Sequence, residues 1–367
     1  MRKKSMKKIK LLYVTRKYPP AVGGMENFSY NLYSGFDAEK VEKDIIALGK
    51  PQKNLVWFLP YALIKTLIKA RKYDIVFIGD ALLSSIGFFT KLLYPRKKTV
   101  VNVFGLDITF RNRLYQLYLK LFYNRFDKYI AISSETEKAF KKRGGKRSCV
   151  ISCGVDTEQF SGECADYEEI CRRNGIGKDD IVLVTVGRLV KRKGAEWFVS
   201  NVMPLLKDEK VKYLIIGDGE ERGNIAESIK EHGLGDKVKM LGRVDNAELN
   251  AVYTHADAFI MPNIHVDGDM EGFGLVAVEA GLAGLAVFAS GIEGIRDAVI
   301  DGKNGWAMES GNAAQYAERI KDLCANREDY RRKAAEYSIY TRENYSWSSV
   351  CEKYVCLFEK MLGKDKK

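Results

Sequence analysis

Two carboxylates, eight residues apart, stand around a glycine turn in the segment MEGFGLVAVEAG (270–281). Glu271 precedes Gly272-Phe273-Gly274, and Glu279 lies in the apolar run that follows. If the turn opens a helix, its free amides can bind phosphate, and glycine lets a ligand approach the backbone. Glu279 would lie about 7 Å along that helix. This spacing suits a diphosphate at the amides of Gly274 and Leu275 and a ribose diol at Glu279.

Glu271, on the other side of the turn, would then face the end of the diphosphate that carries a sugar. Phe273 lies between the two glycines and would line the same place. The pattern therefore suits a nucleotide-sugar. Short glycine motifs are weak signals, so an ordinary loop followed by a solvated helix residue remains an alternative.

A second segment, VTVGRLVKRKG (184–194), reads as a strand, a tight turn at Gly187, and then the cations Arg188 and Lys193. A diphosphate leaving group gains negative charge as its bond to the sugar breaks. Two fixed cations can stabilise that charge without a metal ion. The alternative is a solvated basic loop before a helix.

Further segments have weaker signals. LGRV (241–244) ends a strand, and the backbone at Val244 could contact a nucleotide base, although an ordinary strand end is the stronger interpretation for Arg243. In the first half, Gly23 and Gly24 follow the first strand and open a helix whose amides could face the same diphosphate.

The elements that would position these residues are apolar runs, each followed by a helical pattern. Continuous apolar runs alternating with helices are typical of parallel sheets that are buried on both faces. We expect two doubly wound domains, separated near the polar stretch 157–169, with ligands at the carboxyl ends of the strands in a cleft between the domains. The expected strands are 8–15, 74–80, 98–105, 127–133, 148–155, 180–187, 211–219, 238–244, 258–263 and 284–290.

Composition excludes several classes of protein. The seven cysteines form no CxxC pair and there are only three histidines, which argues for reduced thiols in a cytosol and against a zinc site. No stretch approaches the ~20 apolar residues that span a bilayer. Residues 1–160 carry 31 Lys and Arg against 13 Asp and Glu, whereas the remainder carries 29 against 35. This asymmetry indicates an anionic partner for the first half.

Two segments of the basic half, 54–72 and 111–126, mix aromatic, aliphatic and basic residues. Each could form an amphipathic helix on anionic lipid, or a core-facing helix with a solvated basic side. A lipid-linked or phosphorylated acceptor would explain the same charge. Nucleic-acid binding is disfavoured because the chain has no recognised motif for it.

Taken in order, PPxxGG, FGLD (104–107), CGVD…F (153–160), GRL…KG, GDGE, LGRV and EGFGLVAVE resemble the GT-B glycosyltransferases of family four, which are retaining and use nucleoside-diphosphate sugars. The resemblance implies two Rossmann-like domains, 1–160 and 175–345, with a final helix within 346–367 packing back on the first. Within that helix, Ser349 and Glu352 have capping-box spacing.

The same resemblance implies that no metal or other cofactor is required. It places the family's paired glutamates on Glu271 and Glu279, its phosphate-binding Arg and Lys on Arg188 and Lys193, and its glycine loop on Gly23 and Gly24. We therefore expect catalytic roles for Glu271, Arg188 and Lys193. The expected donor-binding residues are Gly23, Gly24, Val244, Phe273, Gly274, Leu275 and Glu279.

One position departs from the family pattern. Many members have a histidine near the reacting carbon where this chain has Phe104, which can neither donate a hydrogen bond nor relay a proton. Three residues later, Asp107 is a candidate acceptor or sugar contact, with a structural role in the turn as the alternative.

We therefore expect a retaining glycosyltransferase, cytoplasmic and peripheral on the inner face of the plasma membrane. It would move a hexose or N-acetylhexosamine from a nucleoside-diphosphate sugar, with UDP favoured, to a glycan or lipid-linked acceptor in surface polysaccharide or glycolipid synthesis. The alternatives are a non-catalytic sugar-nucleotide-binding subunit, which Phe104 favours, and an epimerase or hydrolase on the same fold.

Overall fold

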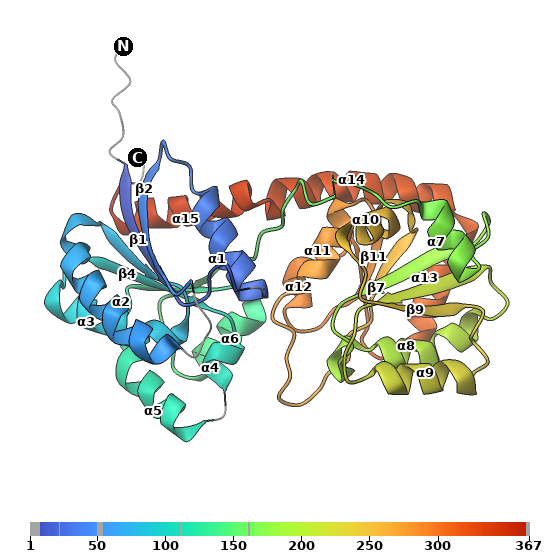
Figure 1. The fold of residues 1–367 in the computed structure, drawn as a ribbon, viewed down its shortest axis with the longest axis horizontal. Coiled ribbons are helices and arrows are strands. Elements are labelled where there is room, and N and C mark those ends of the chain that lie inside the picture. Colours follow the sequence, from blue (N-terminus) through green and yellow to red (C-terminus); the bar gives the residue numbers. More distant parts are fainter. Residues whose placement is uncertain (1–7, 22, 50–53, 111, 161, 365–367) are drawn as a thin grey trace, which may run out of the picture. The chain divides into compact units, whose positions relative to one another are not determined.

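The computed structural model describes residues 8–21, 23–49, 54–110, 112–160 and 162–364. The chain divides into two units (Figure 1), one formed by Met1–Gly154 with Trp347–Lys367 and the other by Val155–Ser346. Val22 of the expected glycine loop, Arg111 of the second amphipathic segment and the basic start of the chain lie outside the described residues.

The first unit is built on a six-stranded sheet whose neighbouring strands all pair in parallel, in the order β2-β1-β3-β4-β5-β6. Its strands are β1 (Ile9–Thr15), β2 (Val41–Ala47), β3 (Ile75–Ile78), β4 (Lys98–Val103), β5 (Lys128–Ala131) and β6 (Ser148–Val150). Its helices are α1 (Gly24–Gly35), α2 (Leu55–Lys69), α3 (Ser84–Leu93), α4 (Leu106–Thr109), α5 (Arg113–Phe122), α6 (Ser134–Lys142) and α15 (Trp347–Met361).

Helices cover both faces of this sheet because alternate residues of each strand point to opposite sides. Val76 and Ile78 of β3 pack with the helices α2 and α5 in one apolar cluster. Phe77, between them, contacts Tyr354 and Phe358 of α15 on the other face. Continuous burial of the strand follows from this two-sided packing.

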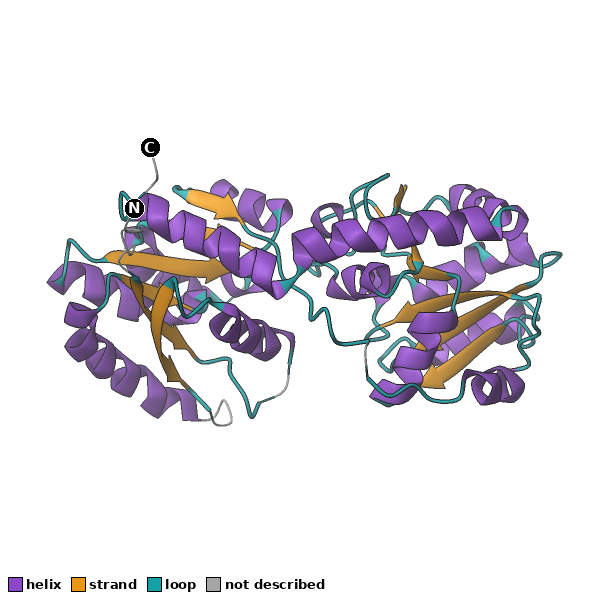
Figure 2. Ribbon diagram, turned by 90° about the horizontal axis from the view of Figure 1, so that it is seen from above, coloured by secondary structure: helices purple, strands orange, loops and turns teal. Residues whose placement is uncertain are grey.

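The second unit repeats the plan, with a parallel sheet in the order β12-β11-β10-β7-β8-β9 between layers of helices (Figure 2). Its strands are β7 (Ile181–Val186), β8 (Val211–Ile216), β9 (Val238–Gly242), β10 (Ala258–Met261), β11 (Ala286–Ser290) and β12 (Trp306–Met308). Its helices are α7 (Tyr167–Asn174), α8 (Ala195–Asn201), α9 (Arg222–Glu231), α10 (Asn246–His255), α11 (Leu275–Leu282), α12 (Ile295–Ala298), α13 (Ala313–Ala325) and α14 (Arg327–Tyr345).

All ten strands expected from apolar runs are present, and the α/β class is confirmed. The sequence pattern missed β2 and β12, which are edge strands of their sheets. Most residues of β2 are only partly buried, so its sequence VEKDIIA lacks a continuous apolar run. The capping box expected at Ser349 is wrong, because α15 already begins at Trp347 and Glu352 instead pairs with Lys40 at 2.6 Å.

Of the helices in the described part of the chain, none combines the length and the apolar character that a bilayer crossing needs.

Each sheet has one switch point, where the chain stops placing successive strands on one side of the sheet and begins to place them on the other. In the second unit β8 and β9 lie on one side of β7, whereas β10 to β12 lie on the other, so the switch falls between β7 and β10. Loops leaving two neighbouring strands in opposite directions open a crevice at the carboxyl ends, where ligands of such sheets bind. The loops after β7 and β10 carry Lys193 and Glu271.

A glycine joins these two loops. Gly194 has a φ of +69°, and a Cβ atom there would lie 2.0 Å from the carbonyl oxygen of Pro262, just after β10. Ile264 also donates its backbone N–H to the carbonyl of Arg192 at 3.0 Å. The backbones therefore touch, and the side chains on either side of Gly194 are brought to the loop after β10.

Gly194→Ala should destabilise the second unit by combining a strained φ with this clash. Gly233→Ala is the matched control, because Gly233 has a φ of +63° but no atom within 4 Å of its Cβ position. We expect about 1–2 kcal/mol for the left-handed backbone in both variants and a further ~1–3 kcal/mol for overpacking at Gly194 alone. Urea unfolding measures the difference, and equal losses would contradict the close approach.

Candidate functional site

The centre of the candidate site in the second unit is an ion pair. Lys193 Nζ lies 2.6 Å from Glu271 Oε2, and Arg192 Nε lies 3.6 Å from the same oxygen. Both partners are largely buried, so solvent screens the pair less than it would at the surface. The loops after β7 and β10 thus meet through opposite charges as well as through their backbones.

Asn263 supports the carboxylate from the loop after β10. Its Nδ2 donates to Glu271 Oε2 at 3.2 Å, and Ser310 Oγ donates to the Asn263 carbonyl at 2.8 Å. The Asn263 side chain is buried, yet its Oδ1 has no hydrogen-bond partner in the described protein. A buried, unpaired acceptor of this kind costs free energy unless another group reaches it.

The environment of Glu271 favours its ionised form. Burial alone would raise the pKa of Glu271, but the Lys193 ammonium, the Arg192 guanidinium and the hydrogen bonds from Lys193 and Asn263 more than offset it and hold the pKa below its usual range. Glu271 is therefore a carboxylate held in one place, which can accept hydrogen bonds but cannot deliver a proton near neutral pH.

Glu293 holds the turn that carries Glu271. Its Oε2 accepts the backbone N–H of Glu271 at 2.5 Å, and it has a φ of +48°, which is unusual for a residue with a side chain. The next residue, Gly294, sits so close that a Cβ there would lie 2.0 Å from the carbonyl oxygen of Gly272. The turn before α11 is thus clamped by the loop after β11.

Helix α11 begins directly after this turn, as the sequence predicts. Gly274 is its N-cap with a φ of +91°, and no side chain caps the helix. The first amides of α11 are therefore open to a ligand. Phe273 points elsewhere: it is buried and its ring centroid lies 6.1 Å from that of Tyr345. Only its backbone can contact a ligand bound at the helix start.

Glu279 lies on the second turn of α11 and has no described hydrogen-bond or ion-pair partner for its half-buried carboxyl. Burial raises the pKa of Glu279 to about 7. Nearby, the hydroxyl of Tyr253 is buried without a hydrogen-bond partner among the described residues. Burial, and then the Glu279 charge, raises the pKa of this phenol. A carboxylate kept unpaired in this way can receive hydrogen bonds from a ligand.

Arg188 and Val244 lie at the carboxyl ends of β7 and β9. Arg188 is exposed and its side chain makes no hydrogen bond or ion pair within the described structure, so its guanidinium is open to an anion. Val244 comes two residues after β9 ends at Gly242. Gly217 N, after β8, donates to the Gly242 carbonyl at 2.7 Å and Gly187 N donates to that of Ile216 at 3.0 Å, which links these strand ends side by side.

The candidate residues of the first unit have partners of their own. Gly23 is the N-cap of α1, and a Cβ there would lie 2.5 Å from Glu26 Oε2. Lys17 Nζ pairs with Glu26 Oε1 at 2.8 Å, while the Cβ position of Gly24 is open. A carboxylate thus occupies the first turn of α1, so a phosphate there would have to share it with Glu26.

Asp107 has a clear structural role. Its Oδ1 accepts the N–H of Phe104 at 2.9 Å and its Oδ2 accepts the N–H of Ala81 at 3.4 Å. Burial and then the nearby Asp80 carboxylate raise the pKa of Asp107 to about 7, against the backbone hydrogen bonds that lower it. Phe104, at the position where many family members have a histidine, packs edge-on against Phe28 with ring centroids 5.1 Å apart.

Sequence patterns missed several residues that shape these places. Asn263, Glu293 and Arg192 in the second unit follow no motif that would single them out. In the first unit, Arg16 pairs with buried Asp80 at 3.1 Å where β1 and β3 end, at the switch point of that sheet. All of these residues except Glu293 follow a strand beside a switch point, which was the signal available in the sequence; Glu293 follows β11.

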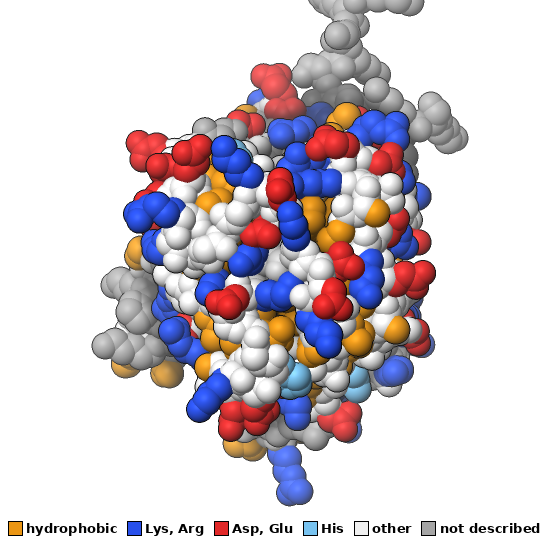
Figure 3. All heavy atoms as spheres, turned by 90° about the vertical axis from the view of Figure 1, so that its right-hand side faces the viewer, with side chains coloured by type: hydrophobic (Ala, Val, Ile, Leu, Met, Phe, Trp, Pro, Cys, Tyr) orange, Lys and Arg blue, Asp and Glu red, His pale blue; other side chains and the backbone are white. Residues whose placement is uncertain are grey.

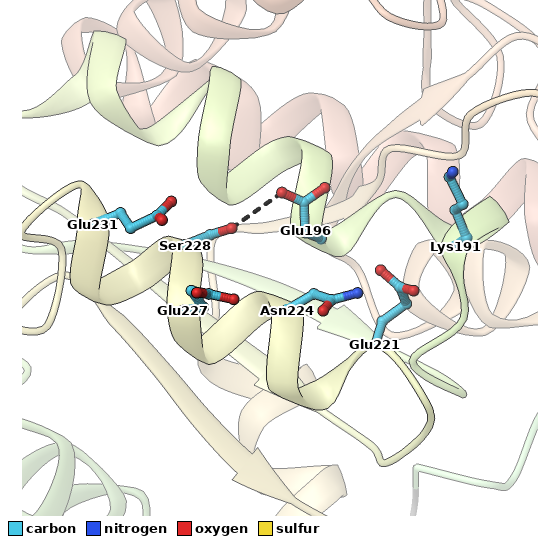
Figure 4. Close-up of a pocket in the computed structure, with 7 residues that line it drawn as sticks. All are labelled: Lys191, Glu196, Glu221, Asn224, Glu227, Ser228 and Glu231. Atoms are coloured by element: carbon cyan, nitrogen blue, oxygen red, sulfur yellow. Dashed lines mark hydrogen bonds between the residues drawn. The ribbon is translucent and has the colours of Figure 1, made fainter.

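A separate hollow of about 440 Å³ in the second unit lies apart from this constellation. It is found between α8 and α9, and Glu196 receives a hydrogen bond from Ser228 within it (Figure 4). Acidic side chains dominate it, so an anionic ligand has no reason to bind there. Its lining residues are Lys191, Glu196, Glu221, Asn224, Glu227, Ser228 and Glu231.

Two family models match the chain and together cover most of it. Residues 166–340 match the model "Glycosyl transferases group 1", and residues 22–159 match "Glycosyltransferase Family 4". The chain belongs to glycosyltransferase family 4.

Relatives of this family 4 chain are about a quarter to a third identical to it over the regions that align. A D-inositol 3-phosphate glycosyltransferase of Corynebacterium urealyticum is 30% identical over 59% of the chain and 51% of its own length. An uncharacterized glycosyltransferase of Methanocaldococcus jannaschii is 26% identical over 79% of the chain and 76% of its own length. The chain spans about half the length of several of the curated relatives that it matches.

Solved structures agree on the fold. HepE of Anabaena, solved in complex with UDP, has a TM-score of 0.73 at 18% identity, covering 96% of this chain and 100% of that one. A glycosyltransferase of Rickettsia africae has a TM-score of 0.74 at 18% identity, covering 98% and 100%. The family 4 chain therefore has the GT-B fold.

The unpaired carboxyl of Glu279 should cost this family 4 chain stability above neutral pH. The unfolded group titrates near 4.5 and the folded one near 7. Because folding raises the pKa, the carboxyl has no such cost below pH 4.5, a growing cost between the two values and the full cost above pH 7. The full cost is about 3 kcal/mol at 1.36 kcal/mol per pKa unit.

Glu279→Gln should therefore stabilise the protein at pH 8 and change little at pH 4.5, as measured by urea unfolding at a series of pH values. Glu227→Gln is the control, because Glu227 is exposed and its replacement relieves no burial. A gain for Glu279→Gln that is independent of pH would contradict the raised pKa.

Proposed function

We propose that this chain is a retaining glycosyltransferase that moves a hexose or N-acetylhexosamine from a nucleoside-diphosphate sugar to a glycan or lipid-linked acceptor. The observation that carries the proposal is the meeting of Lys193 and Glu271 beside the uncapped start of α11, at the switch point of the second sheet. Family 4 membership supports the same reaction class.

The diphosphate would bind at the first amides of α11, at Gly274 and Leu275. The exposed guanidinium of Arg188 and the ammonium of Lys193 would face it from the loop after β7. Charge grows on the diphosphate as the sugar leaves, so two positioned cations and a helix start stabilise the transition state more than the ground state. In this proposal, side chains and backbone amides of the chain itself stabilise the leaving diphosphate.

The nucleoside would extend along α11. Glu279 would accept two hydrogen bonds from a ribose diol, which its unpaired carboxyl leaves room for, and the backbone at Val244 would contact the base. We favour uridine because the Anabaena neighbour was solved with UDP. On the sugar side, ionised Glu271 would accept hydrogen bonds from donor hydroxyls, and the unpaired Oδ1 of Asn263 is a further acceptor.

In a retaining reaction of this kind the acceptor oxygen bonds to the anomeric carbon on the face from which the diphosphate leaves. The bond between that carbon and the phosphate oxygen breaks, and the acceptor proton passes to the departing diphosphate. No protein base is needed, so Phe104 at the family's histidine position is compatible with activity. In the first unit, the amides that follow Gly23 and Gly24 would bind the diphosphate, and Asp107 would contact the acceptor or the donor sugar.

Phe104 also favours a second candidate, a sugar-nucleotide-binding subunit without activity of its own, since its ring packs on Phe28 and offers no polar group. Donor consumption by the purified chain, with extracted lipid as acceptor, separates the two. Release of free sugar or of an epimer without any acceptor would instead indicate a hydrolase or an epimerase.

The surroundings that we propose are the cytoplasmic side of an anionic membrane. All seven cysteines are free thiols, as in a reducing compartment, and the first half of the chain carries the excess of basic residues. A role in surface polysaccharide or glycolipid synthesis would suit a lipid-linked acceptor at this location.

Lys193→Ala and Glu271→Ala should each lower donor turnover at least ~10-fold, a loss of about 1.4 kcal/mol in transition-state stabilisation. Lys191→Ala is the control, because Lys191 belongs to the same basic run but is exposed and lines the acidic hollow instead. The measurement is the rate of nucleoside-diphosphate release. Wild-type rates in both variants would remove this assignment.

Donor binding can be measured without an acceptor. A panel of nucleoside-diphosphate sugars should contain one that raises the melting temperature, since a ligand that binds only the folded state stabilises it by mass action. Arg188→Gln should shrink that increase while leaving the melting temperature of the free protein unchanged, because Arg188 has no partner to lose. An undiminished shift would exclude Arg188 from the diphosphate site.

A further inference from the structure

Three helices of the first unit expose an unusual amount of apolar surface. Helices α2 and α3 pack together, as do α3 and α5, on the same side of the sheet (Figure 1). We call the exposed apolar side chains of these helices the apolar face: Val56, Trp57, Tyr61, Ile64, Ile68, Leu92, Leu93, Leu114, Leu117 and Leu121.

Helix α2 carries apolar side chains on two opposite sides. Phe58, Ala62 and Thr66 are buried against the sheet, as for any core-facing helix. The opposite side nevertheless carries Trp57, 77% exposed, and Ile64, 61% exposed. Together with Tyr61 and Ile68 they follow spacings of three and four, which form one stripe along the helix. A solvated side would carry polar residues at these positions.

Helix α5 repeats this arrangement. Leu119 is buried, whereas Leu114, Leu117 and Leu121 are exposed at spacings of three and four, with Leu114 79% exposed. At the end of α3, Leu92 and Leu93 are exposed as well. All three helices thus turn large aliphatic side chains outward, which a folded core does not require.

The charges beside the apolar face have one sign. None of the segments from Leu55 to Lys72, Ser84 to Leu93 and Arg113 to Arg125 contains an aspartate or glutamate. Lys69 and Lys91 pair with acidic residues elsewhere in the unit. No ion pair to a described carboxylate is found for the remaining cations of these segments, which are Lys65, Arg71, Lys72, Arg113, Lys120 and Arg125.

The second unit looks different. On the face drawn in Figure 3, acidic and basic side chains are interspersed. The large exposed apolar residues of the second unit lie far apart in the sequence: Leu205 lies in the short segment Met203–Leu206 and Ile339, 61% exposed, lies on α14. Single residues of this kind are ordinary on a protein surface. The clustering and the charge bias are therefore properties of α2, α3 and α5.

We propose that the apolar face docks on an anionic lipid bilayer, with its aliphatic side chains among the outer acyl carbons and its cations at the lipid phosphates. Trp57 and Tyr61 suit the headgroup level, where amphipathic aromatic rings concentrate. Basic residues beside an apolar stripe are the pattern of helices that lie in the membrane surface. This inference rests on the membrane contact in the proposed function and names the surface that makes it.

A second copy of the chain fits the face less well. Pairing two copies of this surface would bring lysines and arginines of like sign together with no acidic residue in these helices to neutralise them. An acidic bilayer supplies the opposite charge over a wide area. If the face instead bound a second copy of the chain, this association would not depend on the lipid composition. The experiment can therefore distinguish self-association from membrane binding.

The test is co-sedimentation of the full chain with vesicles of phosphatidylcholine containing about 30% phosphatidylglycerol, without any donor or acceptor. The double variant Ile64→Glu/Leu117→Glu should lower the bound fraction at least ~10-fold, since charges enter the lipid poorly. Ile339→Glu is the matched control, being the same change on a helix at the same 61% exposure. It should bind as wild type does.

Binding should also weaken when phosphatidylglycerol is omitted, because the cations then lose their anionic partners. It should weaken when salt is raised from about 0.1 M to about 0.5 M, because salt screens the attraction between the cations and the lipid phosphates. A Lys65→Gln/Lys120→Gln variant should lose much of this salt dependence. Circular dichroism and the melting temperature establish that each variant is folded.

Equal vesicle binding by wild type and Ile64→Glu/Leu117→Glu, or no binding by wild type, would overturn the proposal. A wild-type dimer in sedimentation that this variant abolishes, with no vesicle binding, would assign the face to self-association. The melting shift with nucleoside-diphosphate sugars reports on the proposed function separately. If a variant that no longer binds vesicles still shows this melting shift, donor binding and membrane binding are separate properties of the chain.

Discussion

The arrangement of the candidate site depends on one electrostatic contact, the ion pair between Lys193 and Glu271. It joins the loops that leave β7 and β10 in opposite directions, and the backbone contact at Gly194 holds those loops close enough for it to form. Asn263 and Glu293 then hold the carboxylate and its turn in place. Together these contacts fix the position of the open amides of α11 relative to the cations Arg192 and Lys193.

Much of the architecture could be predicted from the sequence. Ten strands follow from apolar runs, because a parallel strand buried on both faces needs apolar residues at consecutive positions. The strands β2 and β12 do not: β2 interrupts its apolar residues with charged ones and is only partly buried, and β12 is only three residues long. The start of α11 at Leu275 was also predictable, since Gly272-Phe273-Gly274 marks a turn and the apolar run that follows suits a buried helix.

The site was predictable only as separate pieces. Glu271 and Lys193 each belong to a local motif, but their pairing depends on loops that are 78 positions apart in the sequence and meet through a glycine. Asn263 lies at a strand end with no motif around it, and the burial that acts on Glu279 and Asp107 is a property of the folded unit. The ligand roles of these residues stay predictions, whereas the contacts between them are observed.

Glu279 has one consequence for any ligand that reaches it. A carboxyl group that titrates near pH 7 is partly protonated in the free protein at neutral pH. A diol that donates two hydrogen bonds requires the ionised form, so its arrival displaces that proton into the solvent. The heat of such binding would therefore change with the ionisation enthalpy of the buffer, and the proton count obtained in this way reports the occupancy of this single side chain.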